Sequence, residues 1–97
     1  MTGNALTDRV ALITGGAGGI GIAIARRFGA AGAKIALADL RSDAAEAAAN
    51  ELNRAGYDAF AVAGDVSDPI SAQTIVERTL AKFARVDILV NNAGVMG

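Results

Sequence analysis

Residues 15–21, Gly-Gly-Ala-Gly-Gly-Ile-Gly, carry five glycines in seven positions. Glycine loses more conformational freedom on folding than any other residue, so such a cluster indicates that something comes very close to the backbone. Glycines allow a pyrophosphate to reach the N–H groups at a helix start without a Cβ in the way. We therefore expect a larger side chain at Gly15 or Gly21 to occupy the space of the phosphates. Such a substitution should abolish cofactor binding and leave much of the fold intact. A slack linker is disfavoured, since the cluster joins a strand-like apolar run to a helical pattern.

The glycine spacing fits two registers, G-x-G-x-x-G over 16–21 and T-G-x-x-x-G-x-G over 14–21. It does not fit a P-loop, because Ile22 and Ala23 follow where Lys and Ser/Thr would stand. Asp39 lies 18 residues beyond Gly21, where a second strand is expected to end. A carboxylate there can accept both hydrogen bonds of a ribose diol and would repel a 2′-phosphate, which favours NAD over NADP. Taken alone, Asp39 is equally well explained as a solvated strand-end residue.

Polar and small residues also follow the third and fourth expected strands, as Asp65-Val66 and Asn91-Asn92-Ala93-Gly94. Singly, these residues are typical of loops and turns. Because the carboxyl ends of parallel strands share one edge of a sheet, together they predict one ligand cleft.

The elements that must position these residues alternate between strands and helices. Strands are predicted at 9–14, 34–40, within 58–66 and at 86–90, with helices from Ile20 to Gly32, from a Ser42 or Asp43 cap to Arg54 and Gly56, and from an Asp68-Pro69 cap. Val76, Leu80 and Phe83 are predicted to form the inner face of the third helix. This β-α-β-α-β-α-β order predicts an α/β, Rossmann-type parallel sheet with strand order 3-2-1-4 and helices on both faces.

Composition narrows the function classes. The 97 residues are 53% hydrophobic and 20% charged, as in one globular domain, and the net charge of -1 does not suggest a nucleic-acid partner. The sequence has no cysteine and no histidine, which excludes disulfides, thiol chemistry, histidine catalysis and the usual zinc sites. The uncharged stretch 10–25 is too short and too glycine-rich for a membrane span, and no positive region precedes it. A cytoplasmic protein without membrane contact is expected.

Three motifs resemble those of the short-chain dehydrogenase/reductase family: TGGAGGIG at 14–21, DV at 65–66 and NNAG at 91–94. The resemblance implies the T-G-x-x-x-G-x-G register, with the pyrophosphate and nearby ribose at the glycine-rich loop, the adenosine ribose at Asp39 and the adenine at Asp65 and Val66. Asn91 would lie on the cofactor side of the sheet. Gly18 stands where NADP-preferring members often carry a basic residue, although Arg41 leaves some NADP tolerance open. The expected cofactor-binding set is Thr14, Gly15, Gly18, Gly19, Ile20, Gly21, Asp39, Leu40, Asp65, Val66, Asn91, Ala93 and Gly94.

The family's catalytic residues have no counterpart here. The family uses a Ser and a Tyr-x-x-x-Lys, but the only tyrosine is Tyr57, and position 61 is Ala61. We therefore nominate no catalytic residue and no metal site, and expect the 97-residue chain alone to be inactive. Family chains continue further, so we expect residues 1–97 to be the N-terminal dinucleotide-binding part of a Rossmann domain, truncated after the fourth strand. The intact protein would transfer hydride between a nicotinamide and a small alcohol or carbonyl substrate.

Other interpretations remain open from the residues. The chain could be a non-catalytic dinucleotide-binding module, or an assembly fragment that binds no cofactor. A methyltransferase using S-adenosylmethionine also pairs a glycine loop with a strand-end acid, but NNAG and the Thr14 register count against it. The apolar strand 86–90 is expected to be an exposed edge in this chain, so we expect a homo-oligomer or association through that strand.

Overall fold

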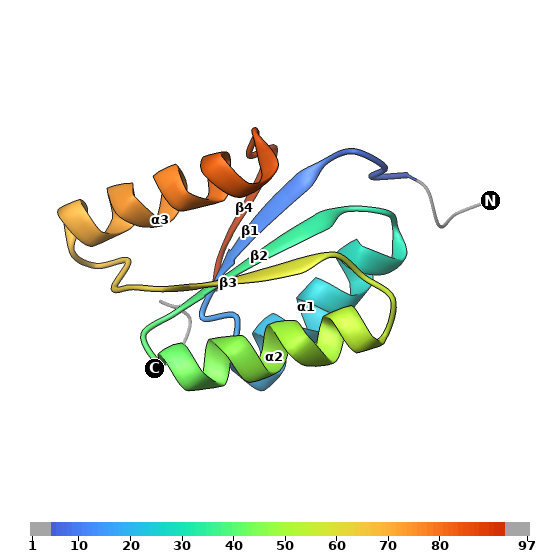
Figure 1. Cartoon of the computed structure of the whole chain (residues 1–97), viewed down its shortest axis with the longest axis horizontal. Helices are drawn as coiled ribbons and strands as arrows, with labels where there is room; N and C mark the ends of the chain where they lie inside the picture. The colour runs from blue at the N-terminus through green and yellow to red at the C-terminus, as the bar shows by residue number, and fades with distance from the viewer. Residues whose placement is uncertain (1–4, 93–97) are drawn as a thin grey trace.

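The computed structural model describes residues 5–92. Within them the chain forms β1 (Val10–Thr14), α1 (Gly19–Ala30), β2 (Lys34–Asp39), α2 (Ser42–Arg54), β3 (Ala59–Ala63), α3 (Pro69–Phe83) and β4 (Ile88–Asn91). The strands pair in parallel in the order β3-β2-β1-β4 (Figure 1). The predicted fold class and strand order are confirmed.

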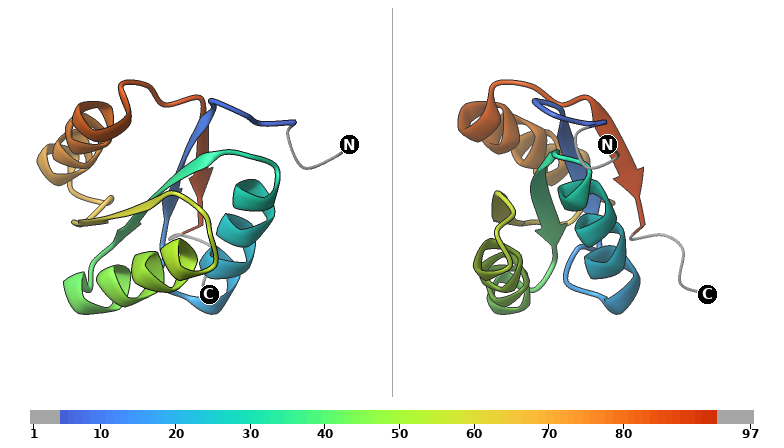
Figure 2. Two further views of the ribbon diagram at one scale, coloured as in Figure 1. Left: turned by 45° about the vertical axis from the view of Figure 1, so that its right-hand side comes forward. Right: turned by 90° about the vertical axis from the view of Figure 1, so that its right-hand side faces the viewer.

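The sheet is covered by helices on both faces (Figure 2). The helices α1 and α2 lie against one face and α3 against the other, as Figure 1 also shows. One core cluster joins Ile13, Ile35 and Leu52 on the α1–α2 side, and a second joins Leu12, Val62 and Ile75 on the α3 side. Strands β1 and β2 are buried on both faces, which explains why their sequences are continuously apolar rather than alternating.

Local signals set most element ends where the sequence predicts them. Gly32 and Gly56 follow α1 and α2 with φ of 100° and 99°, a left-handed conformation that favours glycine. The Asp68 side chain accepts a hydrogen bond from the Ser71 N–H at 2.9 Å, and Pro69 begins α3. These helix ends confirm the predicted stops and the Asp68-Pro69 start.

Two local predictions are wrong. Neither Ser42 nor Asp43 caps α2: Arg41 is at the N-cap position without a side-chain cap, and the Asp43 carboxylate instead accepts the N–H of Ala44. The helix starts one residue earlier than a Ser42 cap would require. Arg41, two residues after the end of β2, is extended, and its N–H donates to the Asp39 carboxylate.

The inner face of α3 also differs from the prediction. Ile75 and Thr79 are buried against the sheet, whereas Val76 and Leu80 are 40% and 43% exposed and Phe83 is partly buried. Thr79 can be buried because its hydroxyl donates to the carbonyl oxygen of Ile75 at 2.8 Å, so no polar group is left unpaired. Phe83 packs against the α3-side core as predicted, so counting apolar side chains is wrong for Val76 and Leu80.

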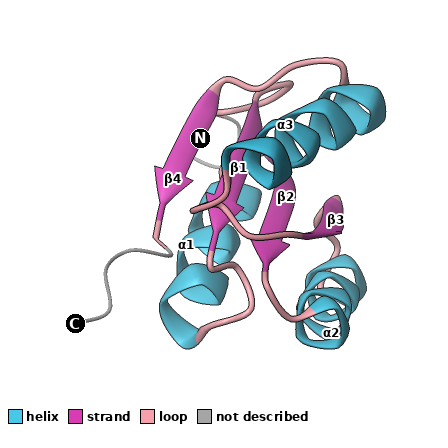
Figure 3. Cartoon of the chain, turned by 90° about the vertical axis from the view of Figure 1, so that its left-hand side faces the viewer, coloured by secondary structure: helices cyan, strands magenta, loops and turns pink. Residues whose placement is uncertain are grey.

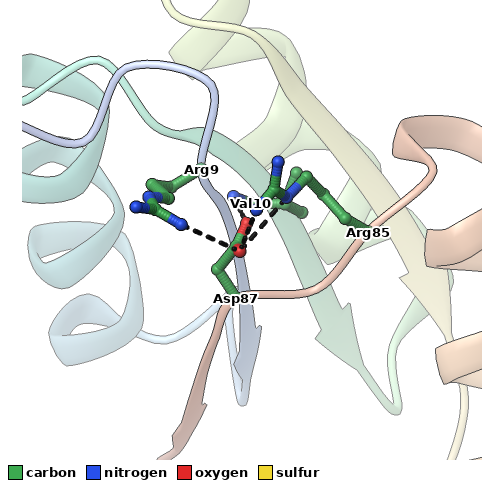
Figure 4. Close-up of polar contacts among 4 residues, drawn as sticks. All are labelled: Arg9, Val10, Arg85 and Asp87. Atoms are coloured by element: carbon green, nitrogen blue, oxygen red, sulfur yellow. Dashed lines mark hydrogen bonds and ion pairs between the residues drawn. The ribbon is translucent and has the colours of Figure 1, made fainter.

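The amino end of the sheet is held by a charged cluster on Asp87 (Figure 4). The Asp87 carboxylate accepts the Val10 N–H at 2.9 Å and two hydrogen bonds from the Arg85 guanidinium, while Arg9 lies 3.5 Å away. The hydrogen bonds from Arg85 and from the Val10 N–H hold the pKa of Asp87 below its usual range. This cluster joins β4 to β1 at the end opposite the predicted cleft.

Candidate dinucleotide site

A cleft of about 550 Å³ lies at the carboxyl edge of the sheet. It is lined by Gly15, Ala38, Asp39, Leu40, Gly64, Asp65, Val66, Ser67 and Asn91. Figure 3 shows the arrowheads of β1, β2 and β4 pointing the same way, so the ends of sequence-distant strands meet at this edge. The structure thus brings together six of the predicted residues: Gly15, Asp39, Leu40, Asp65, Val66 and Asn91.

The glycine-rich loop between β1 and α1 is held close to the neighbouring strand. Gly15 has φ of 65°, which favours glycine, and the Gly16 N–H donates to the carbonyl oxygen of Ala38 at 3.1 Å. A Cβ on Gly16 would lie 2.8 Å from Leu37 Cβ, so the loop packs directly on β2. Gly16 opens the G-x-G-x-x-G register and is not in the expected cofactor-binding set, and its close contact with Leu37 lets the loop lie directly on β2.

The start of α1 is a different environment. Gly18 is its N-cap without a side-chain cap, and a Cβ built on Gly19 would have no heavy atom within 4 Å. The first N–H groups of a helix have no intrahelical partner and carry the positive end of the helix dipole. Packing of the described residues therefore does not require glycine at 19, whereas a ligand lying against these N–H groups would.

Asp39, at the end of β2, spans the gap between the glycine-rich loop and α2. Its Oδ2 accepts the Ala17 N–H at 3.0 Å, its Oδ1 accepts the Arg41 N–H at 3.1 Å, and the Arg41 Nε lies 3.5 Å from Oδ1. Partial burial raises the pKa of this carboxyl, but the two backbone hydrogen bonds and the Arg41 charge outweigh burial, so its pKa lies below its usual range. Asp39 is thus a fixed negative charge in the cleft.

Asp65 and Ser67 shape the turn between β3 and α3. Asp65 Oδ1 accepts hydrogen bonds from the Ser67 hydroxyl at 2.6 Å and the Ser67 N–H at 2.9 Å, which hold the pKa of Asp65 below its usual range. The Asp65 N–H donates to Ser71 Oγ at 2.8 Å. Asp65 therefore both stabilises the turn before α3 and lines the cleft. Ser67 also lines the cleft and was not predicted from the sequence.

Thr14 is buried and does not line the cleft, although it belongs to the predicted set. Its hydroxyl lies 3.2 Å from Asn91 Oδ1 and accepts the Asn92 N–H at 3.0 Å. The Asn92 side chain donates to the carbonyl oxygen of Gly15 at 3.2 Å. Thr14 and Asn92 thus fix the end of β4 beside the glycine-rich loop, which places Asn91 in the cleft.

The remaining predicted residues are not among those that line the cleft, or they fall outside the described residues. Gly18, Gly19, Ile20 and Gly21 lie at the start of α1, and Ala93 and Gly94 fall outside residues 5–92. Within residues 5–92, no group of three or more acidic side chains is arranged to hold a metal ion. No helix of this part of the chain is long and apolar enough to cross a membrane.

A sequence profile of the family described as short chain dehydrogenase matches residues 9–97. The chain belongs to the short chain dehydrogenase family. Among curated relatives, the short chain dehydrogenase/reductase dpmpG of Macrophomina phaseolina (strain MS6) is 46% identical over 92 residues, covering 94% of this chain and 53% of that protein. D-threitol dehydrogenase of Mycolicibacterium smegmatis is 47% identical over 92 residues, covering 93% of this chain and 35% of that enzyme.

A solved structure of a family member has the same fold. The 3-ketoacyl-(acyl-carrier-protein) reductase from Brucella melitensis, solved in complex with NADH, aligns with a TM-score of 0.84 and 46% identity, covering 93% of this chain and 36% of that one. This chain spans between a third and about half of the length of the relatives named here. The family assignment favours the dehydrogenase interpretation over the methyltransferase one.

Proposed function

We propose that residues 1–97 are the N-terminal dinucleotide-binding part of a Rossmann domain, and that the parent protein transfers hydride between a nicotinamide and an alcohol or carbonyl of a small molecule. The observation that carries this proposal is the cleft at the carboxyl edge of the sheet, where Gly15, Asp39 and Asn91 meet from three strand ends. Ligands of doubly wound sheets bind at this edge. Family membership and the NADH-bound relative support the same function.

The described residues fit a dinucleotide. The uncapped start of α1 and the open space at Gly19 suit a pyrophosphate, and the Asp39 carboxylate suits the hydroxyls of the adenosine ribose. Leu40 is 72% exposed and, with Val66, gives the cleft an apolar wall against which an adenine can lie. When bound, the nicotinamide supplies the hydride donor or acceptor; the residues of this chain bind and orient the adenosine diphosphate half.

The proposed cofactor is NAD(H) rather than NADP(H). Asp39 is held ionised beside the cleft, and a 2′-phosphate near it would be repelled. No cation stands at Gly18, and the guanidinium of Arg41 lies against Asp39, where it offsets part of the charge. Arg41 therefore weakens the preference for NAD(H) over NADP(H) without reversing it.

We expect the isolated chain to bind cofactor without catalysing hydride transfer. Tyr57 follows α2 in a loop, and its ring packs beside Gly29, away from the residues that line the cleft. Position 61, where a lysine partner would stand, is an alanine within β3. The proton donor for the parent reaction would come from other parts of the protein.

We further propose that the chain associates through β4 and that the parent protein is cytoplasmic. Leu89 is 64% exposed, and β4 pairs with β1 on one side only among residues 5–92. The unpaired edge and the exposed leucine support association with a second copy.

Titration calorimetry of the chain with NAD⁺, NADP⁺ and S-adenosylmethionine tests the function. We expect NAD⁺ to bind most tightly and S-adenosylmethionine not to bind. A folded chain that binds neither dinucleotide would contradict the proposal and leave the assembly alternative. An assay of carbonyl reduction by NADH, with host dehydrogenases removed, tests the expected inactivity of the isolated chain.

A further inference from the structure

We propose that Asp39 is a positioning residue for the glycine-rich loop in addition to its proposed role as an acceptor for ribose hydroxyls. This inference rests on the proposed function, because the loop it positions is the proposed diphosphate site. The Asp39 carboxylate at the end of β2 binds the Ala17 N–H, in the middle of the loop, 22 residues away in sequence. Asp39 acts on a diphosphate through Ala17 and does not need to touch it.

Few other hydrogen bonds hold the centre of the glycine-rich loop. Gly16 is held by the Ala38 carbonyl oxygen at 3.1 Å, and the Gly18 N–H donates within the loop to the carbonyl oxygen of Gly15 at 3.2 Å. Between these two bonds, the hydrogen bond from the Ala17 N–H to the Asp39 carboxylate links the middle of the loop to the end of β2. Glycine-rich backbone has many accessible conformations, so fixing one of them before a ligand arrives lowers the entropic cost of binding.

The carboxylate can perform both roles at once. Oδ2 accepts from Ala17 and Oδ1 accepts from the Arg41 N–H, and each oxygen has two lone pairs. The Arg41 guanidinium also lies 3.5 Å from Oδ1, so Oδ2 is the oxygen that retains acceptor capacity, and the Asp39 side chain borders the cleft. Ribose hydroxyls can bind without displacing the Ala17 N–H, so loop position and ribose recognition are coupled through one residue.

The two roles are separable by pairing a ligand change with a residue change. We would measure binding of ADP and of 2′,3′-dideoxy-ADP, which lacks the ribose hydroxyls, to the wild type, Asp39→Asn and Asp39→Ala. Both substitutions remove the same negative charge, but only asparagine keeps an oxygen that can accept from Ala17. Comparing Asn with Ala therefore isolates the hydrogen bond from the charge effect on the phosphates.

We expect Asp39→Ala to bind dideoxy-ADP about threefold to tenfold more weakly than Asp39→Asn, the effect of one hydrogen bond. Hydrogen exchange of the Ala17 amide should be slow in the wild type and in Asp39→Asn, and fast in Asp39→Ala. Equal binding of dideoxy-ADP by the two variants would show that Asp39 acts on the ribose alone. Rapid exchange of Ala17 in the wild type would overturn the inference without any variant, which covers the case in which Asp39→Ala does not fold. A wild-type chain that binds no ADP would instead contradict the proposed function.

Discussion

A Cβ atom built on Gly21 would overlap the carbonyl oxygen of Gly15 and would lie 2.9 Å from the Cα atom of Gly16. The first turn of α1 therefore packs directly on the backbone of the loop that precedes it. This contact changes the reason for glycine at position 21: the chain itself, rather than a phosphate, occupies the space of the missing side chain. A larger residue at Gly21 would disturb the fold, contrary to the expectation that it would leave much of the fold intact.

Gly19 and Gly21 are therefore expected to respond oppositely to alanine. Gly19→Ala places a methyl group in open space at the start of a helix, so unfolding stability should stay equal or rise by up to about 1 kcal/mol, while NAD⁺ binding weakens. Gly21→Ala forces the loop and helix apart and should lower stability by about 1–3 kcal/mol. Urea unfolding and calorimetry on both variants would measure this contrast. Unchanged NAD⁺ affinity in Gly19→Ala would show that the start of α1 does not face the cofactor.

Asp39→Ala is expected to weaken NAD⁺ binding by about 1–3 kcal/mol, because hydrogen bonds to a charged acceptor are lost. NADP⁺ binding should weaken less or improve, since the charge that opposes a 2′-phosphate is gone and the Arg41 guanidinium is released from its partner. Arg41→Ala is the matched control, and should widen the preference for NAD⁺. Titrations with both dinucleotides measure the ratio, and a wild-type preference for NADP⁺ would contradict the proposed cofactor.

The sequence predicts the element order, the strand order and most of the cleft because these depend on strong local signals. Continuous apolar runs such as Val10–Thr14 require burial on both faces, and parallel connections leave few topologies. Glycines at 32 and 56 mark helix ends through a left-handed backbone conformation, and the Asp68-Pro69 pair marks a helix start through a side-chain cap followed by proline. The ends of parallel strands then place Asp39, Asp65 and Asn91 at one edge without further information.

What the sequence could not predict depends on hydrogen bonds and backbone contacts that residue type and spacing do not specify. Thr79 is inside and Val76 outside because a hydroxyl can pair within its own helix, which a count of apolar residues ignores. The contact of Asp39 with Ala17 and the overlap between Gly21 and Gly15 depend on loop geometry that spacing does not specify. One polar signal was available: a threonine at the end of a buried strand needs a hydroxyl partner, and the Asn91-Asn92 pair supplies it.

Thr14→Val is expected to lower both stability and NAD⁺ affinity. The substitution keeps the shape but removes a hydroxyl that donates to Asn91 Oδ1 and accepts from the Asn92 N–H. The Asn92 N–H keeps its bond to the carbonyl oxygen of Val90 at 3.1 Å, so the cost is that of the lost hydroxyl bonds, about 1 kcal/mol. Thr79→Val is the matched control, because that buried hydroxyl serves only its own helix on the far side of the sheet. Denaturant unfolding should show lower stability for both variants, whereas calorimetry should show weaker NAD⁺ binding for Thr14→Val alone. Equal NAD⁺ affinity in the two variants would contradict a role for Thr14 in placing Asn91.

Asp87 is expected to make the stability of the chain acid-sensitive. Its pKa in the folded state lies below the ordinary 3.8, so Asp87 stabilises the fold above that value, and the stabilisation is lost as the pH falls through the folded-state pKa. Urea midpoints measured between neutral pH and pH about 2 should therefore fall more steeply for the wild type than for Asp87→Asn. Arg85→Ala should move the loss to higher pH, because it removes the main cause of the lowered pKa. Parallel profiles for the wild type and Asp87→Asn would rule out this contribution.

Leu89→Lys is expected to convert the chain from an associating species to a monomer. Leu89 lies on the edge strand β4 opposite Leu12, so its side chain projects on the same face of the sheet as the α3-side core, and it is 64% exposed. A lysine there places a charge on an edge strand, which is how natural sheets prevent edge-to-edge pairing. Ile70→Lys is the matched control: Ile70 is 77% exposed at the start of α3, so the same change in charge and hydropathy occurs away from β4. Sedimentation over a range of concentrations should show association of the wild type and Ile70→Lys but not of Leu89→Lys. A wild type that stays monomeric at high concentration would refute association, and monomers from both variants would point to general surface hydrophobicity instead of the β4 edge.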